Sequence, residues 1–253
     1  MTDPHAPAPT PPPAEATPPG APPAAGPNDD PLARPLARPL ELALSPRDLR
    51  ELLVASFVLS LVLGVGFYAL DYLNLHRVEQ GATPWQPETS LDAHVPLSPV
   101  WIWPYLVYFP FCFVPLLFCG RIERFRVVVR SYLYTYVPCL ALFSVVPTKM
   151  DRPAFEVTDV TTRWLQGLYD FDPGYNIFPS LHCANAVLVA WIVQHWAPRW
   201  ALPGWTLALA IAASTVLVKQ HYVVDVPAGL LLGSVAYALA FRLGRKTGGG
   251  AAA

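Results

Sequence analysis

Long stretches without a charged residue constrain the fold of this chain more than any other feature. Only 14% of its 253 residues are charged, against about 25% in a typical soluble domain. A helix that crosses a bilayer needs about 20 mostly apolar residues. We expect such helices at residues 52–70, 95–120, 131–148, 181–198, 200–218 and 226–241. The sequence therefore predicts an all-α integral membrane bundle of about six transmembrane helices, with five or seven as alternatives.

The two ends of the chain differ from this apolar middle. Residues 1–45 are rich in proline and alanine, and such a composition cannot bury enough apolar surface to fold. We therefore expect a disordered N-terminal tail, which lacks the pattern of a cleaved signal peptide. Residues 46–246 are predicted to form the membrane domain, and 247–253 a flexible C-terminus. The net charge of −1 suggests no nucleic-acid partner.

The four cysteines give no sign of a disulfide framework or a zinc site. They all fall in apolar stretches, where cysteine usually behaves as a small hydrophobic residue, and none forms a Cys-x-x-Cys pair. The positions are Cys112, Cys119, Cys139 and Cys183. We expect neither a metal nor a cofactor.

Lysine and arginine are distributed unevenly between the two sides of the predicted bundle. With the N-terminus in the cytoplasm, twelve lie inside: Arg34, Arg38, Arg47, Arg50, Arg121, Arg124, Arg126, Arg130, Arg199, Arg242, Arg245 and Lys246. Five lie outside: Arg77, Lys149, Arg152, Arg163 and Lys219. The positive-inside rule favours this orientation, so we expect a multi-pass protein of a bacterial inner membrane whose outer face meets the periplasm. Four of the outer cations lie in residues 148–180 and 219–225, which indicates an anionic ligand there.

Three short segments on that outer face, 149–153, 178–182 and 214–225, hold the residues suited to chemistry. His221 and Asp225 are four residues apart and share one face of a helix. A carboxylate bonded to one imidazole nitrogen leaves the other nitrogen free as a nucleophile or base. The alternative is an interfacial ion pair that only tethers two helices.

The other two segments supply groups that suit a phosphate. Ser180 resembles a helix N-cap, free N–H groups at a helix start bind anions, and His182 in the first turn can protonate a leaving oxygen. Lys149 and Arg152 are either cations at a span end or an anion clamp. Together the segments offer the nucleophile, acid and clamp of a metal-free phosphoryl transfer.

Pro-Ser-Leu-His at 179–182 is followed by Ser214 and by His221-Tyr222-x-x-Asp225, with Gly229 beyond. This set resembles the phosphatidic acid phosphatase type 2 superfamily over residues 145–235. Val145 stands where the family has a lysine, and Thr215 where it has an arginine. Because of these departures the chain looks more like the branch of inositol phosphorylceramide synthase and, more distantly, sphingomyelin synthase, whose members move a phospho-headgroup between lipids.

The resemblance implies a role for each matching residue. His221 attacks phosphorus to form a phosphohistidine, Asp225 orients His221, and His182 protonates the leaving alcohol and then activates the acceptor. Arg152 and Ser180 bind phosphate. Ser214 matches the motif serine, while Lys149 and Lys219 are added as phosphate ligands by spacing and charge alone.

The sequence thus predicts a membrane enzyme that hydrolyses a lipid phosphoester without a metal, with a lipid phosphate and membrane lipids as its partners. The first alternative is a lipid phosphotransferase that resembles inositol phosphorylceramide synthase. A non-enzymatic alternative is an anion-binding or transport protein, although no internal repeat suggests a transporter. A metal or haem site on His182 and His221 is disfavoured because the neighbouring cations would repel a metal ion.

Overall fold

The computed structural model describes residues 45–248, with side chains up to Leu243. The predicted tail therefore lies outside the described residues except for Ser45, and so does most of the segment 247–253. Within the described part all regular elements are helical. In chain order they are α1 (Pro46–Glu79), η1 (Asp92–His94), η2 (Pro99–Trp101), α2 (Ile102–Phe111), η3 (Val114–Phe118), α3 (Ile122–Val145), α4 (Val160–Phe171), α5 (Leu181–Trp196), η4 (Pro198–Trp200), α6 (Ala201–Leu217) and α7 (Asp225–Gly248).

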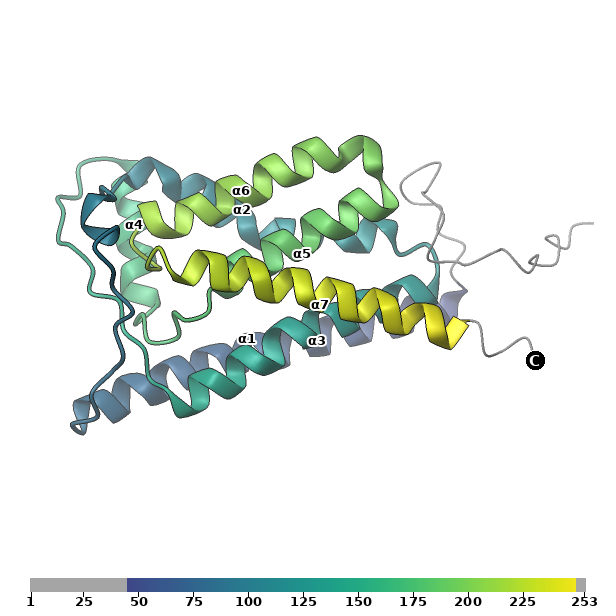
Figure 1. The fold of residues 1–253 in the computed structure, drawn as a ribbon, viewed down its shortest axis with the longest axis horizontal. Coiled ribbons are helices and arrows are strands. Elements are labelled where there is room, and N and C mark those ends of the chain that lie inside the picture. Colours follow the sequence, from purple (N-terminus) through teal and green to yellow (C-terminus); the bar gives the residue numbers. More distant parts are fainter. Residues whose placement is uncertain (1–44, 249–253) are drawn as a thin grey trace, which may run out of the picture.

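The long helices lie side by side and form an elongated bundle (Figure 1). In the part of the chain that the structure describes, four helices are long and apolar enough to cross a membrane: Pro46–Glu79, Ile122–Val145, Pro198–Leu217 and Asp225–Leu243. These four correspond to the first, third, fifth and sixth predicted spans, of which the third and fifth were predicted to extend three residues and one residue further. The helix at the fourth, α5, has 16 residues, about 24 Å at 1.5 Å per residue. The number six therefore stays a prediction.

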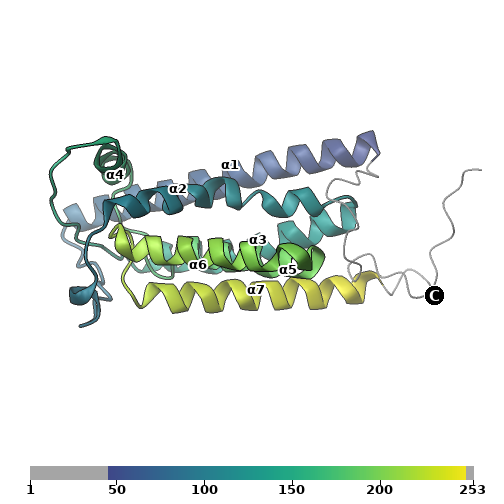
Figure 2. The same cartoon turned by 90° about the horizontal axis from the view of Figure 1, so that it is seen from above.

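The second predicted span is interrupted rather than continuous. Proline lacks a backbone N–H and disfavours a helical residue before it. Accordingly α2 ends one residue after Pro110, and the chain continues as the 3₁₀ helix η3, which has Pro115 in its first turn. The chain nevertheless keeps the direction of the bundle through both pieces (Figure 2).

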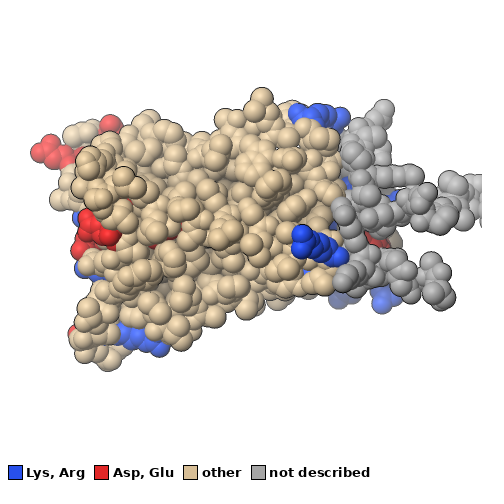
Figure 3. Space-filling model, in the orientation of Figure 1, with Lys and Arg blue, Asp and Glu red and all other residues tan. Residues whose placement is uncertain are grey.

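Charged side chains gather at the two ends of the molecule, and the broad band between them is almost free of Lys, Arg, Asp and Glu on the visible face (Figure 3). Many large apolar side chains are exposed along this band, Phe57, Val65 and Leu231 among them. A soluble protein would bury such residues. The exposed apolar surface and the four long apolar helices indicate a membrane protein.

Helix α5 lies at the centre of the bundle and packs against α6 and α7. Two glycines of α7 make the contact with α5 close. A Cβ atom at Gly229 would overlap the carbonyl oxygen of Ser180, and one at Gly233 would overlap the carbonyl oxygen of Ala184. This small-xxx-small spacing lets two helix backbones approach each other in a membrane, and it aligns the first turn of α5 with that of α7.

The end of the bundle at which α5 and α7 begin is covered by α4 and by the long connections (Figures 1 and 2). Helix α4 lies within residues 148–180, a segment for which no helix was predicted. Asp159 caps it in a reciprocal capping box with Thr162, and Leu165 of this helix is fully buried. The capping residues and the apolar spacing are signals that could have revealed it.

Candidate active site

His221 lies in the turn before α7, and Asp225 is the first residue of α7, so the two do not share a helix face as predicted, although their side chains meet. His221 Nδ1 is 2.8 Å from the carbonyl oxygen of Ile177 and 3.2 Å from Asp225 Oδ2. Both partners are acceptors, so Nδ1 carries the proton and Nε2 keeps a free lone pair. Asp225 is fully buried and also accepts from the backbone N–H of Tyr222 at 3.0 Å. Asp225 therefore fixes both the tautomer and the orientation of His221.

His221 is reached by a short turn that leaves α6. The backbone N–H groups of Gln220 and His221 both donate to the carbonyl oxygen of Thr215, at 2.9 and 3.0 Å. Lys219 takes the left-handed conformation that this reversal requires, with φ at 52°. The backbone of the Ser214–Thr215 motif thus positions His221.

His182 lies in the first turn of α5 among aromatic rings of α2. Its ring centroid is 4.5 Å from that of Tyr105 and 4.2 Å from that of Tyr108. The ring of His221 is 5.8 Å away in an edge-on arrangement. Nε2 of His182 is buried and has no hydrogen-bond partner. Because buried polar atoms are normally paired, this nitrogen is suited to meet a bound ligand.

The two histidines line one small pocket together with Gln220, Asn176, Asp172 and Gly174, and with apolar residues of α1 and α2. The amide nitrogen of Gln220 is buried there without a partner, like His182 Nε2. An amide nitrogen is a donor, and a phosphate presents only acceptor oxygens when ionised. The pocket therefore joins a lone-pair nitrogen with donors for an anion.

Arg152 does not line this pocket, and its guanidinium already forms hydrogen bonds within the protein. It donates to Asp172 Oδ1 at 3.1 Å, to the backbone oxygen of Asp172, and to the side-chain oxygen of Gln220 at 2.6 Å. Its guanidinium lies 4.7 Å from the ring centroid of Tyr169, whose pKa is raised to about 12, mainly by burial. Only Nε lacks a partner. Arg152 thus orients Gln220, whose free amide nitrogen belongs to the pocket.

Gly174 leaves room for Arg152. A Cβ atom at this glycine would stand 2.9 Å from a guanidinium nitrogen, and its φ of 78° is one that other residues rarely adopt. The backbone N–H of Gly174 also donates to Asp172 Oδ1 at 2.7 Å. Gly174 therefore bonds Asp172 and leaves the space that Arg152 occupies in the ion pair.

The two serines of the predicted phosphate site are used within the fold. Ser180 is the N-cap of α5, as expected, and accepts from the backbone N–H of Cys183 at 3.3 Å. Ser214 is fully buried in α6 and donates to the carbonyl oxygen of Ile211 at 2.6 Å. Neither side chain lines the pocket of the two histidines.

The two lysines also point elsewhere. Lys149 forms an exposed ion pair with Asp151 at 2.8 Å, and this hydrogen bond raises the pKa of Lys149 and lowers that of Asp151. Lys219 donates to the backbone oxygens of Asp92 and Val95 at 3.3 and 2.6 Å. Lys219 therefore links the segment between α1 and α2 to the turn that carries His221.

Asp92 adds further hydrogen bonds between the same two segments. Its carboxylate accepts from the backbone N–H of Val223 at 2.7 Å and from the hydroxyl and N–H of Thr89. Burial raises the pKa of Asp92, but these hydrogen bonds and the charge of Lys219 outweigh burial and hold the pKa below its usual value. Asp92 is thus an ionised anchor for the residues that follow His221.

Sequence reasoning missed the polar residues of α1 and α5 that brace the site. Asp71 accepts from the backbone N–H of Tyr175 at 2.7 Å. Asn74 donates to Asn176 at 3.1 Å, and the two residues are 102 positions apart. Asn185 of α5 donates to the hydroxyl of Tyr108 at 2.8 Å. A buried polar residue in an apolar helix is a functional signal by default, and it would have singled out all three helix residues.

Among residues 45–248 no group of three or more His, Cys, Asp or Glu residues could hold a metal ion. The described cysteines are free. The donors of the site are instead imidazole, amide and guanidinium nitrogens, which suit an anion.

The structure thus has a pair of neighbouring histidines and an orienting carboxylate at one end of a bundle with helices of spanning length, which is the architecture of a membrane protein. The PAP2 superfamily matches residues 75–239, well over half of the sequence, and the chain belongs to this superfamily. Membership implies activity of the phosphatase or phosphotransferase type. No curated protein and no solved structure matches the chain in the comparisons made.

Proposed function

We propose that the protein hydrolyses a lipid phosphoester through a phosphohistidine at His221. The observation that carries this proposal is the hydrogen bonding of His221, because Nδ1 meets only acceptors and Nε2 is left with its lone pair. A nucleophile held in one tautomer beside a second imidazole, whose buried Nε2 has no partner, is the arrangement that a two-step phosphoryl transfer requires.

In the proposed first step, Nε2 of His221 attacks phosphorus while the bond from phosphorus to the alcohol oxygen breaks. His182, protonated when the anionic phosphate is bound, gives a proton to that oxygen and becomes neutral. In the second step His182 takes a proton from water, the hydroxide forms the new bond to phosphorus, and the phosphorus–nitrogen bond breaks. Asp225 stabilises the imidazolium character of His221 throughout, as the orienting carboxylate of a triad does.

Gln220 joins the predicted phosphate ligands in this proposal. Its free amide nitrogen lies in the pocket, and Arg152 orients it from behind. Arg152 contributes positive charge close to the pocket, and the first turn of α5, capped by Ser180, contributes backbone N–H groups. Ser214, Lys149 and Lys219 act on the framework of the site through the contacts described above.

A lipid alcohol in place of water would turn the same chemistry into headgroup transfer. The departures Val145 and Thr215, which remove two cations of the usual family motifs, favour this second candidate. In both cases we infer that the site faces the outside of a bacterial inner membrane, as the distribution of lysine and arginine suggests.

A substrate panel tests the proposed function. Purified protein is incubated with labelled lipid phosphates and phospholipids, with and without diacylglycerol, ceramide and inositol lipids, and with or without EDTA. Free phosphate is the expected product, unchanged by the chelator. A new labelled phospholipid would establish the transfer alternative. Turnover that EDTA abolishes and Mg²⁺ or Zn²⁺ restores would overturn the mechanism.

A further inference from the structure

Two hollows with mostly apolar walls continue from the histidine pocket into the interior of the membrane band, and the first of them also meets Asp172 and His182 at its pocket end. The first, the junction hollow, of about 110 Å³, shares Tyr105, Leu181 and His182 with the histidine pocket. The second, the deep hollow, of about 230 Å³, shares Leu63 and Gly64 with the junction hollow. The three spaces therefore follow one another from His182 towards the middle of α1.

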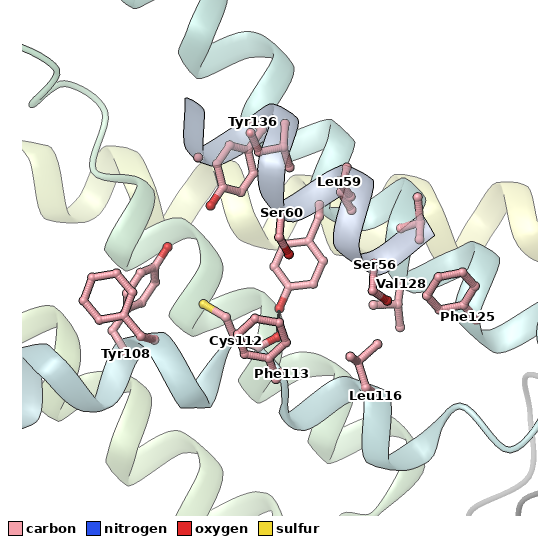
Figure 4. A pocket seen from close by; sticks show the side chains of 15 residues that line it. Ser56, Leu59, Ser60, Tyr108, Cys112, Phe113, Leu116, Phe125, Val128 and Tyr136 are labelled. Carbon is pink, nitrogen blue, oxygen red and sulfur yellow. Dashed lines mark hydrogen bonds between the residues drawn. The ribbon is translucent and has the colours of Figure 1, made fainter. Parts of the chain in front are cut away.

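Side chains from α1, α2, η3 and α3 converge on the deep hollow (Figure 4). None of the fifteen residues that line it is charged. Along α1 the lining extends from Gly64 back to Ser56, eight residues or about 12 Å at 1.5 Å per residue. At its far end the hollow meets Leu116 and Phe125. This chemistry and elongated shape suit a hydrocarbon chain.

Gly64 keeps the passage between the two hollows open. A Cβ atom built at this residue would meet no atom within 4 Å. Protein interiors are normally packed as densely as organic crystals, and an apolar cavity stays free of water. An open, mostly apolar space next to the two histidines therefore calls for an apolar occupant that also reaches His182.

We propose that one hydrocarbon chain of the substrate lipid lies in the junction and deep hollows, which places its phosphate at His221. This inference rests on the proposed function and adds that chain length is selected between α1 and α2. A chain that entered here would never leave the membrane, because α1 and α3 both belong to the apolar helices of spanning length.

Substitution at Gly64 tests whether a hydrocarbon chain occupies the two hollows. Gly64→Phe places a ring in the space that is open around this residue. The ratio of kcat/KM for a long-chain lipid phosphate over that for p-nitrophenyl phosphate should fall by about 10-fold or more, since each buried methylene contributes strongly to binding. Val65→Phe is the matched control, because Val65 is 58% exposed on the same helix and lines neither hollow. An unchanged ratio in Gly64→Phe would overturn the proposal.

A deeper substitution adds a graded test. Leu59→Trp narrows the deep hollow but not the junction hollow. It should shift the preferred chain length to shorter lipids while the shortest lipids keep their wild-type kcat/KM. Equal losses at every chain length, or none at any, would contradict a chain that extends from Gly64 towards Ser56.

Photo-crosslinking tests binding of the chain in the two hollows independently of the phosphoryl transfer. A lipid phosphate with a diazirine at the end of its chain is bound to His221→Ala, and labelled peptides are sequenced. We expect labels near Leu116 and Phe125, competed by unlabelled lipid phosphate but not by diacylglycerol. Labels there that either lipid displaces equally would indicate bulk lipid and overturn the inference. Because the variant needs no turnover, failure of the proposed function would be seen separately, as a wild type that releases no phosphate from any substrate.

Discussion

The two sides of the bundle, α5 to α7 and α1, differ in how tightly they are packed. Helix α5 buries 12 of its 16 residues against α6 and α7, and two glycines bring its backbone against α7. Helix α1 buries only four of 34 residues, and two of these, Asp71 and Asn74, are polar residues at its outer end. The difference teaches that α5 to α7 hold the reacting groups rigidly. Polar contacts hold α1 in place near the site. Further along α1 a hollow remains, which can accept substrate chains of different length.

The largest effect should come from the rigid side. His182→Ala should lower turnover of a lipid phosphate by about 10²- to 10⁴-fold, because the leaving alcohol loses its acid. Much of the loss should be recovered with p-nitrophenyl phosphate, whose leaving group needs little protonation. Rates on both substrates measure this, with His76→Ala, an exposed histidine, as the control. Equal losses on both substrates would remove His182 from proton transfer.

Arg152→Lys should have the next largest effect. The lysine keeps the charge but loses the forked donor that holds Asp172 and Gln220, and a displaced Gln220 should cost about 10- to 100-fold in kcat/KM. Lys149→Ala is the contrast, since an exposed ion pair contributes about 1 kcal/mol at most, and should change little. Wild-type kinetics in Arg152→Lys would mean that the fork does not organise the pocket.

Alanine at two glycines compares the packing of the two sides directly. Gly233→Ala overlaps the backbone of α5, and we expect it to lower the free energy of unfolding by about 1–3 kcal/mol. Gly64→Ala enters open space and should be neutral or stabilising by about 0.5–1 kcal/mol. Thermal unfolding in one detergent gives both values. The packing difference would be refuted if the two variants shifted the midpoint alike.

The smallest effect concerns Asp92, which connects the two sides. Its pKa is held below the usual value, so its hydrogen bonds stabilise the fold above the unfolded pKa of about 3.9 and are lost as the pH falls through the lower folded pKa. Asp92→Asn should therefore lose about 0.5–1.5 kcal/mol near neutral pH and approach the wild type in acid. Unfolding measured from pH 7 to pH 3 checks this, and a pH-independent gap would contradict it.

Local patterns account for what the sequence predicted well. Four of the six apolar stretches correspond to the four long apolar helices, because a spanning helix can be recognised from a continuous run of apolar residues. Ser180 caps α5 as expected. His221 and Asp225 meet as predicted, but they do not share a helix face, because His221 lies in the turn before α7 and only Asp225 belongs to the helix. The match of the family to residues 75–239 confirms the superfamily, while the closer likeness to inositol phosphorylceramide synthase stays a prediction.

Contacts between distant segments account for what the sequence could not reveal. Asn74 meets Asn176 across 102 positions, and no periodicity predicts such a pair. Lys219 has the right charge for a phosphate ligand, but its backbone conformation directs it to Val95. Gln220 was not predicted as a phosphate ligand, and only its contact with Arg152 and its place in the pocket lining show that its amide borders the pocket.

Trapping the phosphoenzyme tests the central claim most directly. Wild type, His182→Ala and His221→Ala are mixed with p-nitrophenyl phosphate, quenched in alkaline denaturant, and analysed by peptide mass spectrometry. The account predicts a phosphate on His221 in the wild type, more of it in His182→Ala, where water is no longer activated, and none in His221→Ala. A phosphate on His182 that persists in His221→Ala would contradict the account.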